Sequence, residues 1–159
     1  MGVLAFVVTA DPLDLGSIIT LVARRLEDEP SSTGAVTSFL GTVRNDSHGR
    51  RVDRLEYEAY EPLAISEGEK VITEAGERFA ILYAHCVHRT GMLEIGECAV
   101  WVGVSSEHRD EAFSACRYII DQVKVRLPIW KKEHYTNGNA GWVSCKRCAQ
   151  HAHTSTASL

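Results

Sequence analysis

The order of secondary-structure patterns limits most strongly what this chain can fold into. Segments with strand patterns outnumber segments with helical patterns about two to one, and the two kinds alternate along the chain. Near the end, Asn137 and Gly138 form a dipeptide typical of a tight β-hairpin turn. A hairpin joins antiparallel strands, whereas parallel strands need a long crossover connection. The pattern therefore predicts an α+β fold with mixed or antiparallel sheets and about three helices.

The predicted elements follow one another with no internal repeat and no composition break before about residue 144. A chain of 159 residues has the length of one domain. We predict that residues 1–143 form this domain and that residues 144–159 form a loosely ordered tail. Helical patterns begin at Asp14, at Pro62 and at Ser105 or Ser106, and the third predicted helix buries Phe113. Strand patterns cover residues 3–8, 34–43, 52–60, 81–87, 98–104, 129–135 and 141–143, with a glycine-containing link at 90–93.

A basic segment stands out in an otherwise acidic chain. The chain has 17 Lys and Arg against 21 Asp and Glu, for a formal net charge of −4, so it is a poor candidate for binding nucleic acid. Between residues 122 and 132, however, four residues are basic and none is acidic. Pro128 imposes a rigid turn between Lys124 and Lys131, so both amines can lie near one pocket. Close cations lower each other's pKa, and such a lysine can act as a nucleophile or proton carrier.

Two other places favour an anion. Arg44 follows a strand and begins a polar loop, where a guanidinium can bind a phosphate or carboxylate in bidentate fashion. His108 and Arg109 lie near the start of the predicted third helix, where the helix dipole attracts anions. His88 and Arg89 also follow a strand, but the pattern assigns them to the turn that comes next. The residues alone thus predict a cationic pocket for a small, phosphate-bearing anion.

The cysteines and the apolar segments indicate a cytoplasmic protein. No stretch has the pattern of a secretory signal or is long enough to span a bilayer. The five cysteines are an odd number, which disfavours a disulfide scaffold. In the tail, four side chains could bind zinc, but their spacing is not that of a usual zinc finger, so we favour a tail without metal and keep zinc as the alternative. These four are Cys145, Cys148, His151 and His153.

Five segments of the chain resemble the large, catalytic subunit of molybdopterin synthase. They occur in the order and with the spacing of that family, and together they cover roughly residues 3–143. A single such segment is a weak signal, but five in register are highly specific. The segments are FLGTVRN at 39–45, LEYEAY at 55–60, HRTGMLEIGE at 88–97, VGVSSEHR at 102–109 and KVRLPIWKKE at 124–133.

The resemblance implies an α/β-hammerhead fold and a homodimer in which each subunit binds a small ubiquitin-like sulfur carrier, giving a heterotetramer. The Gly-Gly tail of the carrier, as a thiocarboxylate, would enter the pocket and donate sulfur to cyclic pyranopterin monophosphate. Two rounds would form the dithiolene of molybdopterin. The expected activity is that of a sulfurtransferase without a cofactor or metal of its own and without a nucleic-acid or membrane partner.

The resemblance also assigns roles to individual residues. It makes Lys124 and Lys131 the catalytic lysines, and it leaves open whether Lys124 acts covalently or electrostatically. A basic residue just beyond Trp142 and Val143 would reach the neighbouring subunit, and here Lys146 or Arg147 could do so. Besides the two lysines, the expected substrate-binding residues are Thr42, Val43, Arg44, His108, Arg109, Lys132 and Glu133.

Two other functions remain as alternatives. The same cationic pocket could serve a phosphate-ester hydrolase or transferase, although no carboxylate cluster marks a metal for such a reaction. The basic segment could instead be a docking surface on a non-catalytic module that binds the tail of a carrier.

Overall fold

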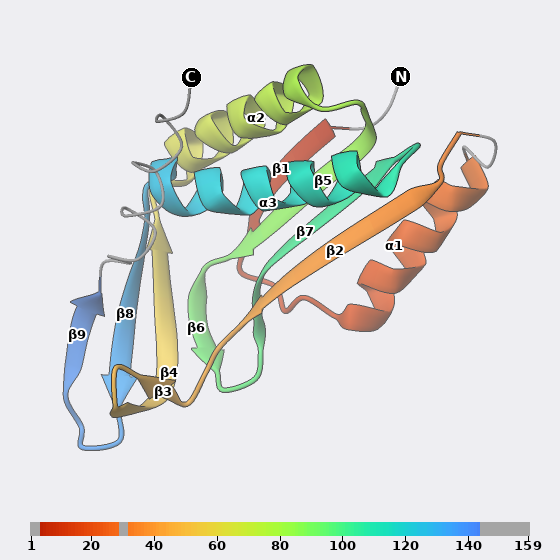
Figure 1. The fold of residues 1–159 in the computed structure, drawn as a ribbon. Helices are drawn as coiled ribbons and strands as arrows, with labels where there is room; N and C mark the ends of the chain where they lie inside the picture. Colours follow the sequence, from red (N-terminus) through yellow and green to blue (C-terminus); the bar gives the residue numbers. More distant parts are fainter. Residues whose placement is uncertain (1–3, 29–31, 144–159) are drawn as a thin grey trace.

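Figure 1 shows the fold in a computed structural model, which describes residues 4–28 and 32–143. The first of two sheets has the strand order β1-β5-β7-β2. Strand β1 runs parallel to β5, whereas β7 is antiparallel to both β5 and β2. The sheet is therefore mixed, as the sequence predicts. Its strands are β1 (Leu4–Thr9), β2 (Ala35–Thr42), β5 (Ile81–Arg89) and β7 (Cys98–Ser106).

Two helices, α2 (Glu61–Arg78) and α3 (Arg109–Arg126), pack on one face of this sheet (Figure 1). The main core fills the space between the helices and the sheet, with Phe6, Val71, Ile72, Cys86, Val102, Cys116 and Ile119 among its members. Helix α2 approaches β1 so closely that a side chain at Gly68 would overlap the ring of Phe6. Helices α2 and α3 therefore form one layer that packs tightly on the first sheet, and this packing fixes the C-terminal end of α3 relative to β5.

Helix α1 (Leu15–Asp28) begins where the sequence predicts. The carboxylate of Asp14 accepts hydrogen bonds from the backbone N–H and the hydroxyl of Ser17, both at 2.9 Å. These bonds satisfy donors that the first turn of a helix leaves free. They also lower the pKa of the Asp14 carboxyl, with the bond from the Ser17 backbone as the largest cause.

The second sheet has the order β3-β4-β8-β9, and β6 pairs with β4 on its other side. Its pairings are antiparallel. A smaller core cluster, which includes Leu55 and Leu93, lies against this sheet. The Asn137-Gly138 turn joins β8 to β9 as predicted, with Gly138 at a φ of 83°. The strands are β3 (Asp46–Ser47), β4 (Arg50–Ala59), β6 (Gly91–Glu94), β8 (Ile129–Tyr135) and β9 (Ala140–Val143).

Three local predictions were wrong. The link at 90–93 is mostly a strand, β6, because Gly91 to Glu94 pair with β4. The third helix does not begin at Ser105 or Ser106, because β7 continues through Ser106. Phe113 is 63% exposed, because its neighbour Ala112, and not Phe113, lies on the buried side of α3. The predicted α+β class with three helices is nevertheless confirmed in the described part of the chain.

Several predictions fall at or beyond residue 144. Lys146 and Arg147 lie outside the described residues, as do the four possible zinc ligands of the tail. The boundary between a domain and a tail at residue 144 therefore stays a prediction. Among residues 4–28 and 32–143, no helix is long and apolar enough to cross a bilayer. The same residues contain no group of three or more side chains placed to hold a metal ion.

Candidate active site

Lys124 and Lys131 approach the junction of the two sheets from different elements. Lys124 lies exposed in the last turn of α3, and Lys131 lies in β8, beyond the turn at Pro128. In the ladder between β4 and β8, Lys131 is directly opposite Tyr57. The Tyr57 ring meets the His88 ring edge-to-face, with 5.2 Å between the ring centroids. This ring contact joins the surroundings of Lys131 on β8 to β5 of the first sheet.

Lys131 is held by a buried carboxylate. Its Nζ lies 3.0 Å from Oε1 of Glu133, which is only 2% exposed. The hydroxyl of Tyr135 donates to the other oxygen of Glu133 at 2.9 Å. Burial alone would raise the pKa of the Glu133 carboxyl, but hydrogen bonds from Lys131, Ser47 and Tyr135 outweigh burial and lower it. Glu133 is thus an ionised acceptor that fixes Lys131 and is turned away from solvent.

Lys132 points to the opposite face of β8 from Lys131, because successive side chains of a strand alternate. Its Nζ lies 3.6 Å from Oε2 of Glu56 and 5.4 Å from the centroid of the Trp142 ring. The side chain of Lys132 is therefore separated from that of Lys131 by the sheet, and the structure does not bring the two amines together.

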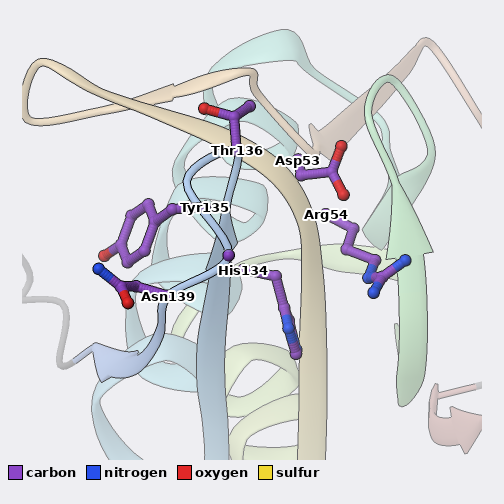
Figure 2. Close-up of a pocket in the computed structure, with 7 residues that line it drawn as sticks. Asp53, Arg54, His134, Tyr135, Thr136 and Asn139 are labelled. Atoms are coloured by element: carbon purple, nitrogen blue, oxygen red, sulfur yellow. The ribbon is translucent and has the colours of Figure 1, made fainter.

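A polar cavity of about 290 Å³ lies on the second sheet near the β8–β9 turn (Figure 2). No predicted site residue lines it. Figure 2 shows the side chains of Arg54, Thr136 and Asn139 pointing in different directions, so they do not converge on one ligand position. The cavity therefore does not supply the predicted pocket. Its lining consists of Asp53, Arg54, His134, Tyr135, Thr136, Gly138 and Asn139.

His108 and Arg109 lie at the far end of α3 from Lys124. Their side chains are 74% and 83% exposed. Helix α3 begins at Arg109, so the fifteen-residue separation from Lys124 corresponds to about 22 Å along the axis at 1.5 Å per residue. Within one chain, His108 and Arg109 therefore cannot bind the same small ligand as Lys124.

The segment Thr42, Val43 and Arg44 connects the first sheet to the second. Val43 is buried, and its backbone bonds to Gly96 and Glu97 in the loop between β6 and β7. Thr42 and Arg44 are exposed on either side of it. Arg44 is thus available to an anion, with its backbone anchored through Val43.

His88 and Arg89 are both buried, and their side chains have different partners. The side chain of Arg89 lies 3.3 Å from Glu97, in line with the predicted role at the turn. Nδ1 of His88 lies 2.8 Å from the carbonyl oxygen of Arg89. Burial lowers the pKa of His88 to about 4; the hydrogen bond to Arg89 opposes this shift, and the charge of Lys124 adds to it. His88 is therefore neutral at neutral pH.

Sequence reasoning missed Tyr57 as the cross-strand neighbour of Lys131 and did not identify Glu133 as the partner of Lys131. The signal for Glu133 was present, because Lys131, Glu133 and Tyr135 alternate along one strand and must share a face. The contact between Tyr57 and His88 joins two different sheets, which no local pattern encodes.

Comparisons with known proteins agree on one family. The model of the MoaE protein family matches residues 8–126. The molybdopterin synthase catalytic subunit of Pyrococcus abyssi is 48% identical over 117 residues, which cover 74% of this chain and 78% of that protein.

Solved structures give the same result. The MoaE protein of Burkholderia ambifaria superposes with a TM-score of 0.75 at 31% identity, over 94% of this chain and 97% of that one. A complex of subunits 1 and 2 of the molybdopterin-converting factor from Helicobacter pylori contains a chain with the same fold, with a TM-score of 0.71, 20% identity and coverage of 89% and 90%. The chain therefore belongs to the MoaE family of molybdopterin synthase catalytic subunits.

Proposed function

We propose that this chain transfers sulfur from the C-terminal thiocarboxylate of a small ubiquitin-like carrier to cyclic pyranopterin monophosphate. It would thus act as the sulfurtransferase subunit of a molybdopterin synthase. The observation that carries this proposal is the placement of Lys124 in the last turn of α3 and of Lys131 on β8, where it is paired with the buried Glu133 and lies opposite Tyr57. Both reactants are anions, and two cations at one junction attract both of them.

The two lysines differ in what surrounds them, and this suggests different roles. Lys131 is paired with the ionised Glu133, an arrangement that suits a group that gives up and regains a proton. Lys124 is exposed, so its ammonium is available to the thiocarboxylate. There it would stabilise developing charge or form a transient covalent link with the carrier tail. In each round the thiocarboxylate sulfur would bond to a pterin carbon as an oxygen substituent leaves that carbon, the ring phosphate ester in one round and water in the other. Water would then break the acyl–sulfur bond, leaving the sulfur on the pterin as a thiol and the carrier as a carboxylate.

The positions of His108 and Arg109 lead us to propose a homodimer with shared sites. Because these residues lie about 22 Å from Lys124 along one helix, they can bind the substrate phosphate only if a second copy supplies them. A surface for that copy exists on the face of the first sheet opposite α2 and α3. There Val7, Val36 and Leu40 are each 39% exposed, which favours burial against another chain.

The proposed assembly adds one carrier to each subunit, giving a heterotetramer in the cytoplasm. The Helicobacter pylori relative was solved as a complex of two different subunits, which supports a small partner here. Arg44 would bind the phosphate beside the lysines. Thr42, Val43 and Lys132 would contact the substrate through backbone groups or at the edge of the binding site. We assign Glu133 to the holding of Lys131, since its carboxylate is already bonded to Lys131 and Tyr135.

One reconstitution tests the function. The purified chain is mixed with a thiocarboxylated carrier and cyclic pyranopterin monophosphate, and the dithiolene product is quantified. The control is the same carrier ending in an ordinary carboxylate. We expect product with the first carrier and none with the second. Phosphate release without any carrier would indicate a hydrolase, and carrier binding without binding of the pterin would indicate a docking module.

A further inference from the structure

The side chain of Tyr135 is in contact with the group that holds Lys131. Tyr135 is buried on the same face of β8 as Lys131 and Glu133, because the three residues alternate along the strand. Its hydroxyl donates to Oε2 of Glu133 at 2.9 Å, while Oε1 of the same carboxylate lies 3.0 Å from Nζ of Lys131. One oxygen of Glu133 thus contacts the tyrosine and the other contacts the lysine.

The ring of Tyr135 is held from the neighbouring strand. The guanidinium carbon of Arg50 lies over the ring, 3.5 Å from its centroid. Arg50 begins β4, the strand in which Val52 is the cross-strand partner of Tyr135. The backbone N–H of Tyr135 donates to the carbonyl oxygen of Asn139 at 2.8 Å. The ring and the backbone are therefore both held, so the hydroxyl has a fixed position beside Glu133.

A hydrogen bond from a neutral hydroxyl suits a carboxylate that must hold a lysine in place. A bond to an ionised acceptor is roughly twice as strong as one between neutral groups, so it limits the rotation of the carboxylate. The tyrosine hydroxyl adds no charge of its own, and Glu133 stays free to pair with an ammonium. Lys131 therefore meets an ionised acceptor whose position depends on Tyr135.

We infer that Tyr135 is a positioning residue for Lys131 and acts through the carboxylate of Glu133. The inference rests on the proposed function, because it gives Tyr135 a task in proton transfer by Lys131. Position matters for that task, since a proton carrier works only within hydrogen-bond reach of the group that it serves.

A second cluster of the same chemistry joins α2 to α3 and supplies a control. The hydroxyl of Tyr118 donates to Oε2 of Glu74 at 2.7 Å, and the same oxygen lies 2.6 Å from the guanidinium of Arg126. The guanidinium carbon of Arg78 lies 4.6 Å from the centroid of the Tyr118 ring. Tyr118→Phe therefore removes a hydroxyl from the same kind of cluster and is the matched control for Tyr135→Phe.

Two readouts are measured in the full chain for Tyr135→Phe, Glu133→Gln, their double variant and Tyr118→Phe. The first is the kcat and KM of sulfur transfer. The second, without carrier or pterin, is the rate at which an amine-reactive acylating reagent labels Lys131 relative to the exposed Lys70 on α2. Labelling needs no turnover, so it tests the inference even if the chain has no sulfurtransferase activity. The unfolding midpoint of each variant is recorded as well.

We expect Tyr135→Phe to lower kcat by roughly fivefold or more, because a small displacement of a reacting group is costly. The KM for the pterin and the unfolding midpoint should change little. Lys131 should be labelled faster than in the unaltered chain, because its amine is paired for less of the time, and Glu133→Gln should set the upper limit of this increase. Tyr118→Phe should match the unaltered chain in both readouts.

The double variant shows whether Tyr135 acts through Glu133. In Glu133→Gln the amide has no charge to pair with Lys131, so a second change at Tyr135 has little left to transmit. The double variant should therefore have nearly the kcat of Glu133→Gln alone. Losses that multiply would show that the two residues act independently, and this result would overturn the inference.

Two further outcomes also overturn it. The first is an unchanged labelling ratio of Lys131 in Tyr135→Phe. The second is a loss of kcat that only accompanies a lower unfolding midpoint and recurs in Tyr118→Phe, which would mean a structural role. A raised labelling ratio in Tyr135→Phe, in a chain that transfers no sulfur, would support the positioning of Lys131 and refute the proposed function.

Discussion

The Nζ of Lys131 lies 3.0 Å from a carboxylate that the fold buries almost completely, that of Glu133. The two residues are two positions apart on β8, so strand geometry alone puts their side chains on one face. Tyr135, two positions further, completes the row by donating to Glu133. The strand therefore supplies a lysine together with the group that holds it.

The first prediction concerns the two lysines. We expect Lys124→Ala and Lys131→Ala each to remove most sulfur transfer, because each deletes a cation or proton carrier of the proposed site. Carrier binding and the circular dichroism spectrum should stay unchanged. Lys70→Ala is the control, since Lys70 is an exposed lysine that pairs with Glu67 on α2. Near-normal product formation by either site variant would contradict the assignment.

The second prediction concerns Glu133. The native environment lowers the pKa of this carboxyl, so its ionised form stabilises the fold above its unfolded pKa. That stability is lost as the pH falls through the lowered native value. Glu133→Gln should therefore be less stable than the unaltered chain at neutral pH, and the difference should shrink in acid. Urea unfolding at several pH values measures it, and a difference that is constant with pH would argue against the ion pair.

The third prediction concerns His88. Its pKa is lowered to about 4 in the fold from 6.5, so the unfolded chain takes up this proton first as the pH falls. We expect stability to decrease from about pH 6.5 toward pH 4. In His88→Phe this part of the decrease should disappear. Unfolding midpoints of both chains across that range provide the measurement, and parallel curves would be the contradicting result.

The fourth prediction concerns shared sites. One subunit carries Lys124→Ala and Lys131→Ala, and the other carries His108→Ala and Arg109→Ala. Each should be inactive alone. If a symmetric dimer shares its sites, random re-pairing of equal amounts should restore about a quarter of the original activity, since half of the dimers then have one intact site. Full activity of the second variant alone, or no recovery after mixing, would refute the shared site.

The fifth prediction concerns Arg126, a member of the basic segment that is not free to bind substrate. Its guanidinium lies 2.6 Å from Glu74 and 3.3 Å from Glu67 on α2, and Tyr118 also donates to Glu74. These bonds, that from Arg126 first, lower the pKa of the Glu74 carboxyl. Arg126→Met should cost roughly 1 kcal/mol of unfolding free energy, because the group is partly exposed. Sulfur transfer at a temperature below the melting transition should remain, and its loss there would place Arg126 in the site.

Much of the fold could be predicted from local sequence patterns. The start of α1 after Asp14, the start of α2 at Pro62 and the Asn137-Gly138 turn each depend on residues close together in sequence, and each is present as predicted. The predicted start of α3 was wrong. Ser105 and Ser106 have the chemistry of a helix cap, but pairing with β2 and β5 keeps both residues in β7. Tertiary pairing there outweighs a local preference.

Only part of the candidate site could be predicted from the sequence. The basic segment identified Lys124 and Lys131, but it did not reveal which carboxylates pair with Lys132 and with Arg126. Strand alternation turns Lys132 toward Glu56, and the packing of α3 against α2 pairs Arg126 with Glu74. The position of Tyr57 against His88 depends on how two sheets meet, and a one-dimensional pattern carries no information about that.

The alternation of side chains along β8 makes this site sensitive to the length of the strand. A substitution at Lys131 or at Lys132 changes one face of the strand and leaves the other as it was. With Pro128 fixed, deleting Ile129 or Trp130 would shift the rest of the strand by one place and put Lys132 where Lys131 now stands. A lysine would still lie opposite Tyr57, but His134 would then occupy the place of Glu133. The number of residues between Pro128 and Glu133 therefore constrains this site as strictly as the identities of Lys131 and Glu133 do.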